Sequence, residues 1–206
     1  MVFAAWDQFF HGRINSNDCR FIGWLRIAFA FLFVADRLVL SLDLDKLLSP
    51  TDGLVPYWLG RQSYEIHDNM WTVFELAPES DVLLWVVHLI GICQGVLLML
   101  GIAPRFQLIG VYVNLISFQH HNQVIWDGED MMFKAFCMNL LLMPLHRRTI
   151  YDFFGLREDD KPDDSWPMWP IRLFQIEMSF IYIGASLGKI IGEFALVYRL
   201  KLCLFR

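Results

Sequence analysis

Long runs of hydrophobic residues alternate with short polar segments along the chain, and they predict helices that cross a lipid bilayer. A membrane-spanning helix needs about 20 mostly apolar residues. Five stretches approach this length, of which the fourth is the shortest: 21–42, 82–103, 106–126, 130–145 and 169–192. We therefore expect an all-α fold, a polytopic transmembrane helix bundle of about five spans, with residues 1–206 forming a single domain.

The segment between the first two stretches is too apolar and aromatic to be a solvated linker. It contains Tyr57, Trp58, Tyr64 and Trp71. Because Trp and Tyr favour the boundary between membrane and water, we expect one or two short helices lying at that interface.

The composition agrees with a membrane environment. Hydrophobic residues make up 56% of the chain, aromatic residues 16% and charged residues 19%, whereas soluble domains have roughly 45–50% apolar and about 25% charged residues. The first 20 residues include Asp7, His11, Arg13 and Asp18, so no cleavable signal peptide is expected and the first span serves as the targeting signal.

Charge and cysteine content exclude two other classes of protein. The net charge of −5 is spread too diffusely to indicate a nucleic-acid partner. The cysteines are isolated from one another, at positions 19, 93, 137 and 203. They predict neither a disulfide framework nor a zinc site, and we expect no metal.

The distribution of Lys and Arg predicts the orientation, because cytoplasmic segments are enriched in both. Basic residues lie in the leader and in the turns after the second and fourth spans, namely Arg13, Arg20, Arg105, Arg147, Arg148, Arg157 and Lys161. We therefore expect a multi-pass protein with a cytoplasmic amino terminus. The first loop and the Asp127–Asp130 turn then lie outside.

The third span carries a polar stripe. Gln107, Gly110, Asn114, Ser117 and His121 recur at spacings of three and four residues, which places them on one helical face. This face is expected to contact other helices, because small and polar residues join transmembrane helices.

The fifth span carries two patterns. Gly184, Gly188 and Gly192 form a ridge of small residues that favours close helix packing. On a neighbouring face, Lys189 stands between Tyr182 and Glu193. Lys189 has two readings: it either snorkels to the outer interface and pairs with Glu193, or it belongs to a site.

The predicted orientation brings several ionisable residues to the outer face. These are Asp36, Arg37, His88, His120, His121, Asp127, Asp130, Lys189 and Glu193. We treat Asp130 and Lys134 as a structural pair, since they stand four residues apart. Convergent histidines, acids and one lysine suit proton transfer.

Several segments resemble the HTTM domain, the membrane domain of vitamin K-dependent gamma-carboxylases and their bacterial relatives. They are Cys19–Arg26 with the later Asp36, Met99–Phe106, His120–Asp130 and Tyr182–Lys189. The resemblance covers nearly the whole chain and depends on the order and spacing of these motifs.

The resemblance implies quinol-dependent carboxylase chemistry. Lys189 matches the lysine that deprotonates vitamin K hydroquinone in that family. The resulting quinol anion reacts with oxygen to give a strong base. This base removes a proton from a glutamyl side chain, and the carbanion takes up carbon dioxide. An amine acts as a base at neutral pH only where its surroundings disfavour the ammonium form. His120 and His121 are the other expected catalytic residues. His88, Asn122 and Tyr182 are the expected contacts of a vitamin K hydroquinone-like quinol, and the substrate is a glutamate-containing protein.

The chain also departs from that family. It continues as Glu-Phe-Ala-Leu-Val-Tyr after Gly192 and ends at 206, so we expect a truncated domain. We expect it to have no extra-membrane domain, and it has one lysine where the animal enzymes have two. A non-catalytic membrane subunit, with a partner that supplies the missing helices, is therefore an alternative. A transporter or proton relay is a third, less favoured because no broken pair of spans indicates a substrate path.

Overall fold

The computed structural model describes residues 9–10, 12, 16–50, 53–54, 71–121, 128–143, 145 and 168–204, and only the backbone of 16–20, 128–129 and 191–204. Its elements are α2 (Ser16–Leu40), α3 (Leu44–Leu48), the 3₁₀ helix η1 (Val73–Leu76), α5 (Asp81–Leu100), α6 (Pro104–His121), α7 (Gly128–Leu142) and α9 (Trp169–Leu204). These ranges contain helices and no strand, so the all-α prediction is confirmed for this part of the chain.

Each of the five hydrophobic stretches corresponds to one long helix. The first helix begins at Ser16 instead of 21, and the third is described from Pro104 to His121, so that its predicted end at 126 lies outside the described residues. The fourth, α7, is the shortest of them, as the sequence indicates, and its 15 residues reach only about 22 Å. Two short helices, α3 and η1, lie between α2 and α5, which confirms the prediction of short helices in that segment.

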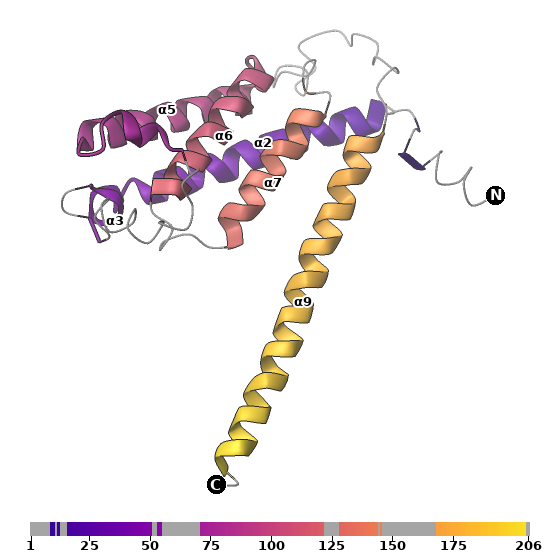
Figure 1. Ribbon diagram of the computed structural model, residues 1–206. Helices are drawn as coiled ribbons and strands as arrows, with labels where there is room; N and C mark the ends of the chain where they lie inside the picture. Colours follow the sequence, from indigo (N-terminus) through magenta and orange to yellow (C-terminus); the bar gives the residue numbers. More distant parts are fainter. Residues whose placement is uncertain are drawn as a thin grey trace. The chain divides into compact units, whose positions relative to one another are not determined.

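The chain divides into two compact units, residues 13–166 and residues 1–12 with 167–206. In the larger unit, α2, α5, α6 and α7 lie side by side (Figure 1). α2 packs against α5, α5 against α6, and α6 against α7. The ring closes where Phe29 of α2 meets Phe133 and Phe136 of α7, at centroid distances of 5.8 and 6.4 Å.

The caps of α5 define its two ends, and the turn that follows it makes α6 run antiparallel to it. Ser80 caps the start of the helix, because its hydroxyl oxygen accepts a hydrogen bond from the Leu83 amide. Gly101 ends the helix in the left-handed conformation, at φ 81°, which glycine adopts without a steric penalty. Pro104 then starts α6, where its missing N–H costs no hydrogen bond. A turn of three residues therefore folds α6 back along α5.

This bundle has an apolar core that also contains polar side chains, and its exterior is apolar as well. Its interior contains buried polar and charged side chains, including Arg26, Arg37, His88, Asn114 and His121. Its exterior exposes large apolar side chains, including Phe31 (61% exposed), Leu38, Val39, Leu89, Ile90 and Phe106 (70% exposed). Soluble monomers rarely expose extended apolar patches.

Within the described residues, α5 is the one helix long and apolar enough on its own to cross a membrane. The other helices of the larger unit fall short for identifiable reasons. α2 contains Arg26, Asp36 and Arg37, α6 carries the polar stripe, and α7 is short. Mean hydropathy does not distinguish a polar residue facing the bundle interior from one facing outward.

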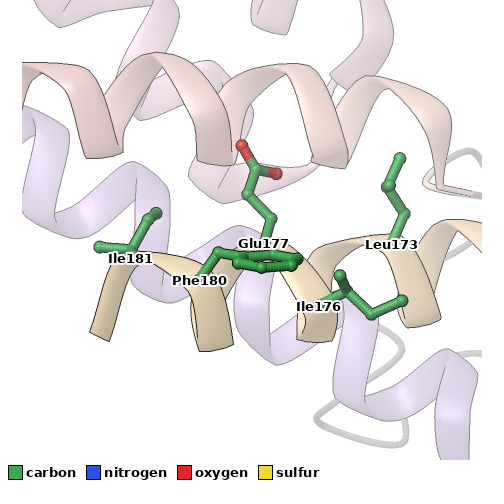
Figure 2. A pocket seen from close by; sticks show the side chains of 5 residues that line it. All are labelled: Leu173, Ile176, Glu177, Phe180 and Ile181. Atoms are coloured by element: carbon green, nitrogen blue, oxygen red, sulfur yellow. The ribbon is translucent and has the colours of Figure 1, made fainter. Parts of the chain in front are cut away.

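The smaller unit consists mainly of α9, a single helix of 36 residues that begins at Trp169. Its apolar side chains are largely exposed, Phe180 by 69%. Leu173, Ile176, Glu177, Phe180 and Ile181 line an open, mostly apolar pocket on this helix (Figure 2). A Cβ built on Gly184 or Gly188 meets no atom within 4 Å.

Candidate functional site

One end of the four-helix bundle collects most of the ionisable side chains singled out from the sequence. The antiparallel order brings together the end of α2, the start of α5, the end of α6 and the start of α7, with α3 and η1 packed against them. Arg37, His88 and His121 therefore approach one another from three helices. The aromatic rings of Phe74 and Phe118 lie among them.

Arg37 is the charged residue of this cluster, and only 3% of it is exposed. Its Cζ atom lies 5.3 Å from the centroid of Phe33 and 4.9 Å from that of Phe118. Aromatic faces attract a cation through their quadrupole. The Nε atom is 3.4 Å from Oδ2 of Asp36, and Asp130 also attracts the guanidinium electrostatically. The cation thus lies beside the Asp36 carboxylate and against two aromatic rings.

His88 is fully buried at the start of α5. Its Nε2 atom lies 2.7 Å from Oγ of Ser41, which in turn donates to the Arg37 carbonyl at 2.9 Å. The imidazole packs edge-on to Trp85 and Phe118, with both ring centroids 5.9 Å away. His88 is therefore fixed in orientation by a polar contact on one side and aromatic contacts on the others.

The two histidines at the end of α6 bind backbone carbonyls. Nε2 of His121 lies 3.0 Å from the Leu48 carbonyl, to which it must donate, because a carbonyl only accepts. The His121 ring is 4.7 Å from that of Phe74. Nδ1 of His120 donates in the same way to the Trp71 carbonyl at 2.8 Å. His121 is buried, whereas His120 is partly exposed.

The polar stripe of α6 does face other elements, so that prediction is confirmed. Asn114 donates from Nδ2 to the Val87 carbonyl of α5 at 2.8 Å, and Gly110 packs against Gln94. Ser117 accepts from the Val73 amide at 3.3 Å, and its carbonyl accepts from Thr72. The stripe attaches α6 to α5 and η1 below the cluster.

Polar contacts also attach α3 to the start of α5. Nε1 of Trp85 donates to Asp45 at 2.7 Å, and Oγ of Ser49 donates to Asp81 at 2.8 Å. On the surface of α3, a hydrogen bond from Lys46 to Asp43 and the charge of that carboxylate raise the pKa of Lys46. α3 is thus held where the Leu48 carbonyl meets His121.

The other expected site residues lie elsewhere. Lys189 and Tyr182 are on α9 in the smaller unit, where both side chains are exposed. Asn122 and Asp127 lie outside the described residues, as does the side chain of Glu193. The convergence of Lys189 with the histidines therefore stays a prediction.

Three members of the cluster were not anticipated from the sequence: Ser41, Phe74 and Phe118. Phe118 stands three residues before His121 on the same helical face, which is a usable signal. Ser41 and Phe74 lie outside the long helices, and their positions depend on how α3 and η1 fold back. Within the described residues, no group of three or more His, Cys, Asp or Glu side chains is arranged to hold a metal ion.

The fold and site thus define the class, for the described residues, as a helical protein whose bundle exposes apolar side chains and buries several ionisable ones. Comparison with family models, curated proteins and solved structures found no match for the chain.

Proposed function

We propose that the chain is an integral membrane protein of about five spans with a cytoplasmic amino terminus. The apolar exterior of the bundle and the ionisable side chains buried in its core support this proposal. A bilayer accepts apolar side chains on the outside of a bundle, and ionisable residues within a membrane protein face its interior, where they pair and often function. α2, α5, α6 and α7 combine both features, although only α5 meets the criteria for a span on its own.

We further propose that the cluster at the end of the bundle takes part in quinol chemistry, with Lys189 as the base. The observation that carries this proposal is the meeting of Arg37, His88 and His121 around Phe74 and Phe118. Aromatic rings suit a planar aromatic ligand, imidazoles accept and donate protons, and a guanidinium stabilises the anion that deprotonation leaves. The role of Lys189 comes from the resemblance to the carboxylase membrane domain. A quinol and a glutamate-containing protein are the proposed cofactor and substrate.

The test measures oxidation of a reduced naphthoquinone by the full chain in lipid vesicles. Lys189→Ala should abolish the reaction while the protein stays inserted in the membrane. Lys189→Arg should keep the charge and still fail, because a guanidinium does not deprotonate near neutral pH. Lys46→Ala is a matched control, since Lys46 is an exposed lysine paired with Asp43. Retained oxidation in both Lys189 variants, or none in the wild type, would reject the enzymatic proposal.

A second candidate is a non-catalytic membrane subunit. It is favoured by the use of His120, His121 and Asn114 as donors to backbone carbonyls, which is a structural role. The open ridge at Gly184 and Gly188 offers a surface for a helix of a partner subunit. Inactive wild-type protein that copurifies with a second membrane protein through α9 would favour this candidate.

A further inference from the structure

The hydroxyl of Ser41 contacts both the Arg37 carbonyl and Nε2 of His88. A serine hydroxyl has one hydrogen and two lone pairs. Ser41 directs its hydrogen to the Arg37 carbonyl, 2.9 Å away, since a carbonyl has no hydrogen to offer. With the hydroxyl hydrogen directed to the carbonyl, a lone pair of Ser41 Oγ faces His88 Nε2 at 2.7 Å, which favours the hydrogen on Nε2. The Nε2–H tautomer of a neutral His88 is thereby favoured.

The other nitrogen of His88 is left as an acceptor. Nδ1 is fully buried and has no hydrogen-bond partner among the residues that the structure describes. Most buried polar atoms in proteins are hydrogen-bonded, and leaving one unsatisfied costs about 1–3 kcal/mol. Trp85 and Phe118 pack edge-on against the imidazole, and the ring is also hydrogen-bonded to the Arg37 backbone, yet neither kind of contact satisfies Nδ1. The lone pair of Nδ1 can therefore accept a hydrogen bond from a donor outside the described residues.

We infer that Ser41 is a positioning residue and that Nδ1 of His88 accepts a hydrogen bond from an O–H group of a bound molecule. A cationic donor is disfavoured there, because the Arg37 guanidinium already places a positive charge beside the imidazole. Two sources supply a neutral O–H group in this setting, a quinol hydroxyl and an ordered water. The choice of a quinol rests on the proposed function, whereas the tautomer and the acceptor do not.

Nitrogen NMR of the full chain, labelled with ¹⁵N-histidine in lipid nanodiscs, tests the tautomer directly. The His88 signals are assigned by their loss in His88→Phe. In the wild type, Nε2 should carry the proton. Ser41→Ala should remove this preference and give a mixture of tautomers, while Ser41→Thr should restore it. Ser179→Ala is the matched control, because Ser179 bonds the carbonyl four residues earlier as Ser41 does but on α9. Protonated Nδ1 in the wild type would overturn the inference.

The ligand arm uses menadiol as the probe and its dimethyl ether as a control that has no hydroxyl. A shift of the Nδ1 resonance with menadiol alone identifies a quinol hydroxyl as the donor, and His88→Phe should then weaken menadiol binding about 2–10-fold. A resonance already in the hydrogen-bonded range, unchanged by either compound, identifies water. A resonance typical of a free imidazole nitrogen under all conditions contradicts the proposed site.

This design separates the inference from the proposed function. A shift of the His88 Nδ1 resonance with menadiol, in a protein that oxidises no quinol, supports the binding site and rejects the enzymatic role of Lys189. Quinol oxidation that depends on Lys189, in a protein whose His88 Nδ1 accepts no hydrogen bond, supports the enzymatic proposal and rejects the proposed binding site at His88.

Discussion

At the scale of single residues, Phe118 connects the groups of the cluster. The centroid of its ring lies 4.9 Å from Cζ of Arg37, 5.2 Å from the centroid of Phe74, which packs edge-on, and 5.9 Å from the centroid of the His88 ring. A buried guanidinium needs compensating interactions, since burial removes its hydration. In this bundle part of that compensation comes from the face of an aromatic ring.

Phe118→Leu should therefore destabilise the bundle by more than the loss of apolar contact alone. Leucine keeps most of the volume but has no ring quadrupole, so we expect a loss of about 1–3 kcal/mol from the cation–π and aromatic pair interactions. Thermal unfolding in detergent measures this change. Phe31→Leu is the matched control because Phe31 is 61% exposed, and an equal effect in both variants would show that Phe118 does not support Arg37.

The sequence predicts a residue's environment well where helical spacing alone decides it. Asn114, Ser117 and His121 follow from spacings of three and four residues, and all three are buried as expected. Ser41 and Phe74 were not predicted, because their positions depend on contacts between distant segments. The hydrogen bond of Ser41 to His88 joins residues 47 positions apart, which no local pattern encodes.

At the scale of elements, α5 is the helix on which the bundle is assembled, since it packs against both α2 and α6. Its glycines allow this. A Cβ on Gly91 would lie 2.6 Å from Nδ2 of Asn114, and one on Gly95 would lie 2.6 Å from Val34. Both distances are shorter than van der Waals contact.

Gly91→Leu should displace Asn114 and break its hydrogen bond to the Val87 carbonyl. Overpacking of a tight contact typically costs about 1–3 kcal/mol. Thermal stability in detergent measures the loss, and Ile90→Leu serves as the control because Ile90 is half exposed on the same helix. Wild-type stability of Gly91→Leu would show that α5 and α6 do not approach this closely.

The glycine ridge of α9 makes a different prediction, because a Cβ on Gly184 or Gly188 meets no atom within 4 Å. If the ridge seats another helix, Gly188→Leu should disrupt folding or assembly, since bulk at a close crossing forces helices apart. The oligomeric state and stability in detergent report the effect. Ala185→Leu adds the same bulk beside the ridge and should have less influence, and unchanged behaviour of both variants would remove the packing role of the ridge.

At the scale of the whole molecule, the hydrophobic stretches predicted where the long helices lie, because a long apolar stretch favours a long helix. The ends of those helices were less predictable. They depend on caps such as Ser80 and Gly101, which hydrophobic content does not register. The antiparallel order of the larger unit also places the expected outer residues of α2, α5 and α6 at one end of the bundle, as the orientation argument requires.

The proposed topology predicts which positions react with a membrane-impermeant thiol reagent. In a variant without the four native cysteines, Asp127→Cys should be labelled from outside and Arg147→Cys only after the membrane is opened. The reason is the excess of Arg and Lys on the predicted cytoplasmic side. Preferential labelling of Asp127→Cys from the cytoplasmic side would reverse the orientation.

The tight turn from Gly101 to Ala103 has a consequence for how the protein is made. α5 is apolar enough to enter a bilayer unaided, whereas α6 brings Gln107, Asn114 and His121. Because three residues separate the two helices, α6 would leave the translocon already paired with the helix that satisfies Asn114. The two helices should therefore insert as one hairpin, and lengthening the turn with a flexible linker should strand α6 in the aqueous phase during synthesis.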